Sequence, residues 1–156
     1  MADIDLQIAC EAPALPDAAF VERCCSAALD KIGRDGALAV RICEPDEIRQ
    51  LNRDFRNKDK STNVLSFPFE LPEHIPDELK LELSELGDIV ICAAVVADEA
   101  RAQQKNLNAH WAHMLVHGCL HLCGYDHIDD NEAEQMEALE VQILADLNFA
   151  NPYETL

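Results

Sequence analysis

The chain has 156 residues, of which 49% are hydrophobic and 27% charged, and its formal net charge is −18. This size and composition predict one globular domain spanning residues 1–156, rather than a disordered chain. No run of roughly 18 apolar residues and no basic stretch followed by an apolar run is present. We therefore expect neither a membrane span nor a signal peptide, and a cytoplasmic protein.

The charge is distributed unevenly along the chain. A net charge of −18 argues against unaided, non-specific nucleic-acid binding, because neutralising phosphates requires a basic surface. Residues 41–60 nevertheless hold six of the twelve basic residues, namely Arg41, Arg49, Arg53, Arg56, Lys58 and Lys60. Acidic residues are interleaved with them, so the segment is either a solvated helix face with ion pairs or a local cationic patch.

The seven cysteines are odd in number, include no CxxC pair and lie mostly in apolar surroundings. This pattern favours reduced cysteines that serve as small core residues over a disulfide framework. Cys119 and Cys123 each lie two residues from His121, so on a helix they point away from it and are poor candidates for metal ligands.

The first half of the chain alternates between strands and helices. Asp3–Ala9 alternates polar and apolar residues, which predicts a half-buried strand. An apolar stripe at helical spacing predicts a helix from Pro16 to about Ile32, and Ala37–Cys43 reads as a second, largely apolar strand. Pro45–Phe55 is predicted to be helical, with acidic residues near its N-terminal end.

The second half begins with two strands and ends in helices. Val64–Pro68 is expected to be a short strand and Leu86–Cys92 the most apolar one, with an exposed loop over residues 69–84 between them. A helix is predicted to follow this strand to about Lys105, and a second one to run from about Leu107 to Leu122. A last helix is predicted after Asp129 and Asp130, which can cap it. The predicted fold class is therefore α+β, with a mixed sheet of about four strands covered by helices.

The helix over residues 107–122 is unusual because Asn106–Tyr125 contains no Asp, Glu, Lys or Arg. A helix that is apolar nearly all round is a buried one, which makes this the central helix of the fold. It nevertheless carries four of the six histidines: His110, His113, His117 and His121. Buried imidazoles need hydrogen-bond partners, so four of them in one interior helix require an explanation.

Three histidines at the end of this helix have the spacing of a metal site. His117 and His121 are four residues apart and project from the same helix face. Gly124 can adopt the left-handed conformation that ends a helix, which would let the chain return His127 to the first two. Three imidazoles and one open position are typical of catalytic zinc, although other divalent transition metals are possible.

The same spacing occurs in zinc proteases with the pattern HExxHxxGxxH, in which the glutamate is the general base. Here Gly118 stands in that position, so peptide hydrolysis would lack its usual base. A metal can also polarise a phosphoryl oxygen, and a guanidinium can match the charge that develops there. Arg49, Arg53 and Arg56 recur at helical spacing, which favours phosphodiester over amide hydrolysis.

The block His117–His127 resembles the signature of the bacterial YbeY family of metal-dependent endoribonucleases. Leu51–Arg56, Asp59–Pro68 and Leu86–Ile91 resemble other blocks of the family in the same order. The resemblance implies that His117, His121 and His127 bind one metal ion, usually zinc. It also implies that Arg56 is the functionally required arginine.

The resemblance further implies cleavage of single-stranded RNA, 16S rRNA 3′-end maturation and a role in ribosome quality control. The implied partners are ribosomal RNA, the small ribosomal subunit, a small-subunit ribosomal protein and a ribosome-assembly GTPase, with no membrane. Two other functions stay open: a non-catalytic ribosome-assembly factor with a structural metal, and a metal-dependent hydrolase of another bond.

Several roles stay open from the sequence. The attacking nucleophile is either a metal-bound water or an RNA 2′-hydroxyl, and no residue identifies a general base. His113 is a core histidine bonded to a carbonyl, a donor that supports the metal ligands, or a proton shuttle. Asp126 either orients an imidazole or shapes the helix end. Trp111 either packs in the core or stacks a base. Ser66 reads only as a strand residue.

Overall fold

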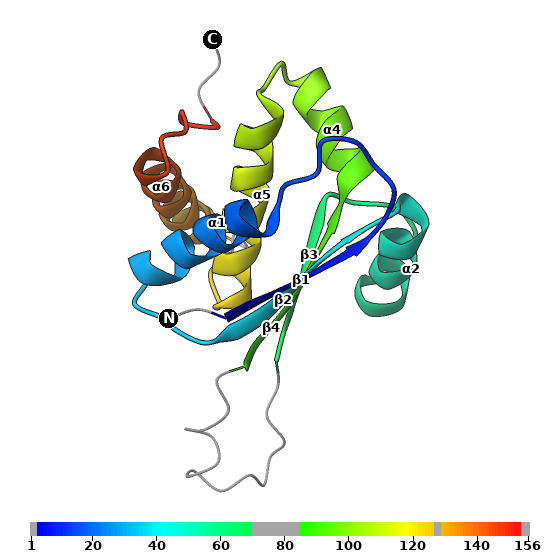
Figure 1. Ribbon diagram of the computed structural model, residues 1–156. Helices are drawn as coiled ribbons and strands as arrows, with labels where there is room; N and C mark the ends of the chain where they lie inside the picture. Colours follow the sequence, from blue (N-terminus) through cyan, green and yellow to red (C-terminus); the bar gives the residue numbers. More distant parts are fainter. Residues whose placement is uncertain (1–2, 70–84, 127–128, 154–156) are drawn as a thin grey trace, which may run out of the picture.

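The computed structural model describes residues 3–69, 85–126 and 129–153 (Figure 1). The strands are β1 (Asp3–Ala9), β2 (Ala37–Cys43), β3 (Val64–Pro68) and β4 (Glu85–Cys92). The helices are α1 (Ala18–Lys31), α2 (Pro45–Arg56), α4 (Ala93–Ala102), α5 (Leu107–Leu122) and α6 (Asp130–Asp146). All but the first residue of the predicted loop over residues 69–84 lies outside the described ranges.

The strands form one four-stranded mixed sheet in the order β1-β2-β4-β3. β1 and β2 are parallel, β2 and β4 are parallel, and β3 runs antiparallel to β4 along the other edge. The prediction of an α+β fold with a mixed sheet of about four strands is therefore confirmed.

Helices cover both faces of the sheet. In Figure 1, α1, α5 and α6 lie on one side of the strands, and α2 lies on the other. Because side chains of a strand alternate between faces, Ile89 and Ile91 of β4 join the larger core with α1, α5 and α6. Val90 and Cys92 join a smaller core under α2. None of the helices in the described ranges combines the length and apolar character that a membrane crossing requires.

Side-chain caps fix where three of the helices begin. Asp17 accepts a hydrogen bond from the Phe20 amide, so α1 begins at Ala18, slightly later than the proline-based expectation. Asn106 caps α5 in the same way, and Asp129 caps α6 as the sequence predicts. α5 is confirmed as the buried central helix, since eleven of its sixteen residues are buried.

Gly118 allows α5 to lie unusually close to the sheet. A Cβ at this position would lie 2.9 Å from Cγ2 and 3.3 Å from Cδ1 of Ile89, a fully buried residue of β4. The side chain that a zinc protease carries here therefore has no room. The absence of a glutamate at position 118 is a packing requirement of this fold as well as a chemical difference.

We predict that Gly118→Ala lowers the free energy of unfolding, which denaturant titration can measure. Overpacking typically costs ~1–3 kcal/mol, whereas alanine returns up to ~1 kcal/mol through its higher helix propensity. The expected net loss is about 1 kcal/mol. Since the same substitution stabilises a helix with open space around it, an increase in stability would contradict the close packing against Ile89.

Candidate metal centre

The C-terminal end of α5 presents a pair of imidazoles beside a helix-ending glycine. Gly124 has a φ of 98°, which confirms the predicted left-handed conformation. The Tyr125 amide donates to the Leu120 carbonyl and the Gly124 amide to the His121 carbonyl, which terminates the helix. The rings of His117 and His121 lie 5.4 Å apart between centroids, on the same helix edge as the spacing predicts.

The third predicted ligand, His127, lies outside the described residues. Among residues 3–69, 85–126 and 129–153, no three His, Cys, Asp or Glu side chains are placed to hold a metal ion together. Within this part of the chain, His117 and His121 are partly exposed and line one cleft. Imidazoles are suitable metal ligands, so these two residues fit a metal ion chemically. The structure therefore does not test whether His127 joins His117 and His121 as a ligand.

The cleft has a volume of about 470 Å³ and joins the histidine pair to the basic segment. His117 and His121 line it from α5, and Ser66 lines it from β3. Arg56, at the end of α2, and Lys58 and Lys60, just beyond it, complete the part of the lining that bears on chemistry. Residues about sixty positions apart in sequence therefore face a common space.

Arg56 is held at the edge of the sheet by backbone and aromatic contacts. Its Nη2 donates to the Ser66 carbonyl at 2.8 Å, and its guanidinium carbon lies 5.1 Å from the centroid of the Phe67 ring. Ser66 in turn donates its hydroxyl to the Gly118 carbonyl at 3.0 Å. One residue of β3 thus connects the arginine to the helix that carries the histidines, a role that the sequence did not indicate.

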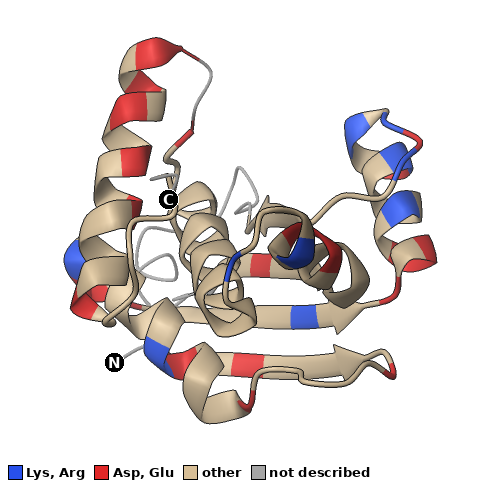
Figure 2. Ribbon diagram, turned by 90° about the horizontal axis from the view of Figure 1, so that it is seen from above, with Lys and Arg blue, Asp and Glu red and all other residues tan. Residues whose placement is uncertain are grey.

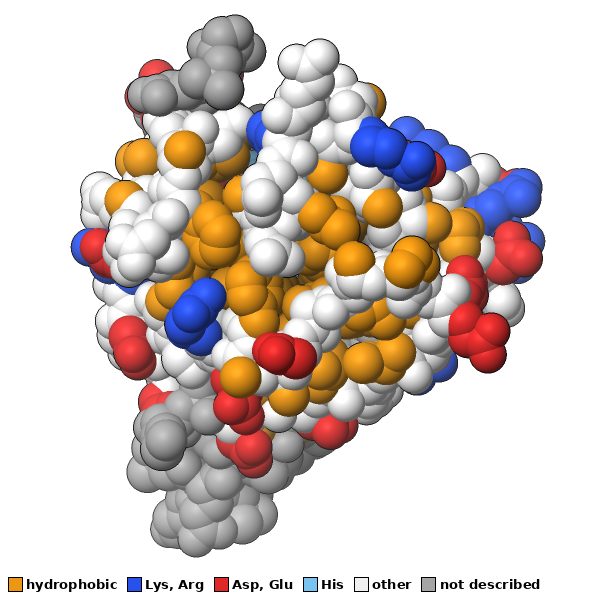
Figure 3. Space-filling view, turned by 45° about the horizontal axis from the view of Figure 1, so that its top comes forward, with side chains coloured by type: hydrophobic (Ala, Val, Ile, Leu, Met, Phe, Trp, Pro, Cys, Tyr) orange, Lys and Arg blue, Asp and Glu red, His pale blue; other side chains and the backbone are white. Residues whose placement is uncertain are grey.

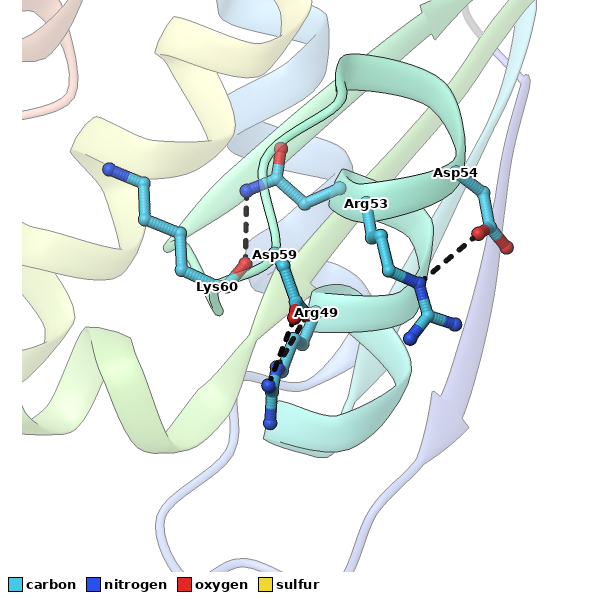
Figure 4. A network of polar contacts seen from close by, with 6 residues as sticks. Arg49, Arg53, Asp54, Asp59 and Lys60 are labelled. Atoms are coloured by element: carbon cyan, nitrogen blue, oxygen red, sulfur yellow. Dashed lines mark hydrogen bonds and ion pairs between the residues drawn. The ribbon is translucent and has the colours of Figure 1, made fainter.

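The other two arginines of α2 are engaged elsewhere (Figure 4). Arg49 pairs with Asp59 at 2.9 Å, and Arg53 lies 3.4 Å from Asp54. Hydrogen bonding to Arg49 lowers the pKa of Asp59. The expected row of three guanidinium groups is therefore divided, and Arg56 alone among the three lines the cleft.

The connection after α2 is shaped by Asn52, whose side chain is buried. Its Nδ2 donates to the Lys60 carbonyl at 3.0 Å, and the backbone carbonyl of Asn52 accepts from the Lys58 amide at 3.2 Å. These bonds fold the chain back beside α2 and bring both lysines to the cleft. On the face shown in Figure 3, Lys and Arg side chains gather at one edge, with Asp and Glu beside them.

Glu140 of α6 is a buried carboxylate beside the histidines that the sequence analysis missed. Its Oε2 lies 2.6 Å from Nε2 of His113 and 3.4 Å from Nδ1 of His117, and its Oε1 accepts a 2.7 Å hydrogen bond from the Tyr153 hydroxyl. Burial alone would raise the pKa of Glu140, but the two histidines outweigh it and lower this pKa to about 2. The sequence signal that could have identified Glu140 is its position, because it lies among apolar residues on the buried face of a predicted helix.

The remaining histidine contacts bear on the roles that the sequence left open. His113 lies 2.6 Å from a Glu140 carboxylate oxygen and 3.3 Å from the Tyr153 hydroxyl, so its partners differ from the backbone carbonyl expected for a core histidine. His110 contacts Glu99 at 3.0 Å, and burial lowers the pKa of His110. Asp126 lies 3.7 Å from Nε2 of His121, where it can help to orient the ring. Trp111 is buried in the core.

The cysteines match the expectation of reduced core residues. All seven are free, and five of them are buried, including Cys119 on α5. A hydrogen bond with Cys25, together with burial, raises the pKa of the Cys119 thiol well above its usual value. A neutral, buried thiol is a poor metal ligand.

Fold and cleft together define a class: an α+β protein in which paired imidazoles and an arginine line one cleft. The family model described as Endoribonuclease YbeY matches residues 11–148. The chain belongs to the Endoribonuclease YbeY family, which confirms the resemblance noted in the sequence.

Two relatives agree with this assignment, and one solved structure shares the fold. The chain is 60% identical over 126 residues to Endoribonuclease YbeY of Hydrogenovibrio crunogenus, covering 81% of this chain and 78% of that protein. It is 52% identical over 153 residues to Endoribonuclease YbeY of Pseudomonas entomophila, covering 98% and 94%. The solution structure of TM1509 from Thermotoga maritima matches with a TM-score of 0.55 and 24% identity over 99% of both chains, which shows the fold alone.

We predict that Ser66→Ala lowers the free energy of unfolding by ~1 kcal/mol, because the Gly118 carbonyl loses its hydrogen bond from β3. Urea titration measures the change. Ser61→Ala, at an exposed position of the preceding connection, is the matched control and should leave stability unchanged. Equal effects of the two substitutions would show that the β3–α5 hydrogen bond contributes nothing.

Proposed function

We propose that the protein is a zinc-dependent endoribonuclease that cleaves single-stranded RNA. The observation that carries the proposal is the shared cleft of His117, His121 and Arg56. Membership of the family supports it, as do the relatives, whose names describe them as endoribonucleases. The composition of the cleft supports it independently, because imidazoles suit a metal and cationic side chains suit a phosphodiester.

In this proposal the metal is held by His117, His121 and His127. When bound, zinc supplies Lewis-acid chemistry that stabilises charge on a phosphoryl oxygen. The chain contributes the orientation of the rings. The helical backbone sets the His117–His121 spacing, and carboxylates contact both imidazoles. No fourth protein ligand is proposed, because a catalytic site keeps a position for substrate.

Arg56 is proposed as the residue that binds the scissile phosphate. Nη2 donates to the Ser66 carbonyl at 2.8 Å and Nη1 to the Phe55 carbonyl at 3.4 Å, which fixes the direction of the group before substrate arrives. The remaining N–H groups can match two phosphate oxygens, since guanidinium geometry suits a bidentate contact. Lys58 and Lys60 add positive charge to the same cleft, which attracts the phosphate backbone of the RNA.

An exposed aromatic ring supports single-stranded RNA as the substrate class. Phe55 is 62% exposed, although it lies beside Arg56 and packs edge-on against Phe67 at 5.5 Å. Proteins that bind single strands combine a basic groove with aromatic faces on which unpaired bases stack. Phe55 lines a separate cavity with Phe67, whose ring lies against Arg56. A single strand that crosses Arg56 can reach both the cleft and this ring, whereas a paired base would be withheld from the ring.

The proposed cellular role follows the family resemblance: 16S rRNA 3′-end maturation and ribosome quality control by a single cytoplasmic domain, residues 1–156. The proposed partners are the small ribosomal subunit, one of its proteins and a ribosome-assembly GTPase. The net charge of −18 supports a partner, because long-range repulsion opposes the approach of free RNA. Docking on a ribosomal particle would present the RNA to the basic edge alone.

We predict that Arg56→Ala lowers the rate of RNA cleavage by about 10²–10³-fold, the usual loss when one preorganised charge-stabilising donor is removed. Bound zinc should be unchanged, because Arg56 is not a metal ligand. Cleavage of a fluorescent single-stranded RNA by metal-loaded protein measures the rate. Arg49→Ala is the matched control, since Arg49 lies on the same helix but pairs with Asp59.

Wild-type cleavage rates in purified Arg56→Ala protein would contradict the role of this guanidinium. Mapping the product termini in the same experiment identifies the nucleophile. A 2′,3′-cyclic phosphate with a 5′-hydroxyl on the downstream product indicates attack by the RNA 2′-hydroxyl, and a 3′-hydroxyl with a 5′-phosphate indicates attack by water.

We predict that His117→Ala lowers zinc affinity by more than about 100-fold, because losing a ligand exceeds the usual effect of losing a supporting residue. RNA cleavage should fall with it, and a chelator should abolish cleavage by the wild type. Competition with a chromophoric chelator measures affinity. If the wild type binds zinc but cleaves no RNA, either as the isolated protein or in the presence of small ribosomal subunits, the non-catalytic assembly factor is favoured instead.

A further inference from the structure

Glu140 is the most deeply buried charged group beside the candidate metal centre. Only 1% of its surface is exposed, and it lies on α6 between the apolar residues Met136 and Ile143. Burying a carboxylate costs several kcal/mol unless charged or hydrogen-bonding groups surround it. Packing alone would be better served by leucine or methionine, so the carboxylate calls for a chemical explanation.

The partners of Glu140 come from two other segments of the chain. His113 and His117 approach Oε2 from α5, at 2.6 Å and 3.4 Å. The Tyr153 hydroxyl, from the segment after α6, donates to Oε1 at 2.7 Å and lies 3.3 Å from Nε2 of His113. The hydrogen bond at Oε1 orients the carboxylate, and it places the buried Oε2, which accepts no hydrogen bond among the described residues, against the two imidazoles.

The nitrogen of His117 that faces this carboxylate is Nδ1. An ionised carboxylate can only accept hydrogen bonds, so its approach to Nδ1 at 3.4 Å favours the tautomer of the neutral ring that carries the proton on Nδ1. The lone pair then resides on Nε2, on the far side of a ring that lines the cleft. Carboxylates that accept from the other ring nitrogen of a metal-binding histidine select the tautomer and the ring orientation in this way.

The same geometry separates His113 from His117. In His113, Nε2 lies against the carboxylate. The nitrogen of His113 that corresponds to the metal-facing Nε2 of His117 is therefore already engaged. His113 therefore helps to hold Glu140 in place, and Glu140 in turn orients the ring of His117.

We propose that Glu140 is a positioning residue for the metal centre: it holds His117 as the Nδ1–H tautomer, so that Nε2 binds the ion. The inference rests on the proposed metal site and extends it to a residue of α6. Tyr153 and His113 keep the carboxylate oriented, which couples the C-terminal segment to the geometry of the cleft.

The test combines two measurements. Long-range ¹H–¹⁵N correlation spectra of the metal-free wild type at neutral pH report the tautomer of each histidine, and His117 should be Nδ1–H. In Glu140→Gln the amide can donate to Nδ1, so the Nε2–H form should appear. Zinc affinity, measured by chelator competition, should fall about 10–100-fold.

Matched variants separate this role from charge and from packing. Glu134→Gln removes one negative charge from an exposed position of the same helix and should leave both measurements unchanged. Tyr153→Phe keeps the ring but removes one hydrogen bond to Glu140, so it should weaken zinc binding by less. Glu140→Asp restores a carboxylate and should recover part of the Nδ1–H signal.

Two results would overturn the inference: His117 as Nε2–H in the metal-free wild type, or Glu140→Gln with wild-type zinc affinity and tautomer. The wild-type spectrum needs no variant, so a Glu140→Gln protein that does not fold still leaves a decision. Absence of RNA cleavage with the tautomer and affinity effects intact would count against the proposed function alone. A wild type that binds no zinc would refute the metal centre.

Discussion

The close contact between α5 and the sheet is the constraint on which the site depends. A helix packed at ordinary distance would separate its backbone from β3, but Gly118 removes the side chain that would meet Ile89. The Gly118 carbonyl can then accept from the Ser66 hydroxyl, and the Ser66 carbonyl accepts from Arg56. Helix, edge strand and arginine are thereby joined by two hydrogen bonds, which fixes where imidazoles and guanidinium face each other.

The distribution of charge explains how so acidic a chain can present a cationic cleft. Figure 2 shows Lys and Arg concentrated on α2 and the chain beside it, and Asp and Glu along α6 at the other side. Interactions between exposed charges decay over about 8–10 Å at physiological ionic strength, so the local basic groups dominate inside the cleft. Ion pairs such as Arg49–Asp59 neutralise part of the segment and leave Arg56 facing the cleft.

The sequence predicted the elements well because their signals are local. Alternation in Asp3–Ala9, the uncharged run after Asn106 and the i,i+4 histidine pair each depend on neighbours within a few residues. The strand order and the direction of β3 needed the structure, since hydrophobic pattern does not fix pairing. The family resemblance singled out Arg56, but only the structure shows that Asp59 and Asp54 engage the other two arginines.

Glu140, Tyr153 and Ser66 could not be found by the same reasoning. Each contacts a residue of α5 from a separate element, so no spacing within one helix or strand reveals the contact. Glu140 also lies where a helical stripe calls for an apolar residue, and binary patterning treats it as an exception at most. The exception was the informative feature, because buried charges cluster where a protein needs chemistry.

The four histidines of α5 show how one helix can divide structural from chemical roles. Side-chain exposure rises along it, from 3% at His110 and 10% at His113 to 22% at His117 and 31% at His121. Each ring meets a carboxylate, from Glu99, Glu140 or Asp126, so contact with an acid does not distinguish a ligand. What distinguishes His117 and His121 is that they also reach the cleft. His117 alone of the four meets its carboxylate through Nδ1, which keeps its Nε2 for an ion, whereas the other three rings meet theirs through Nε2.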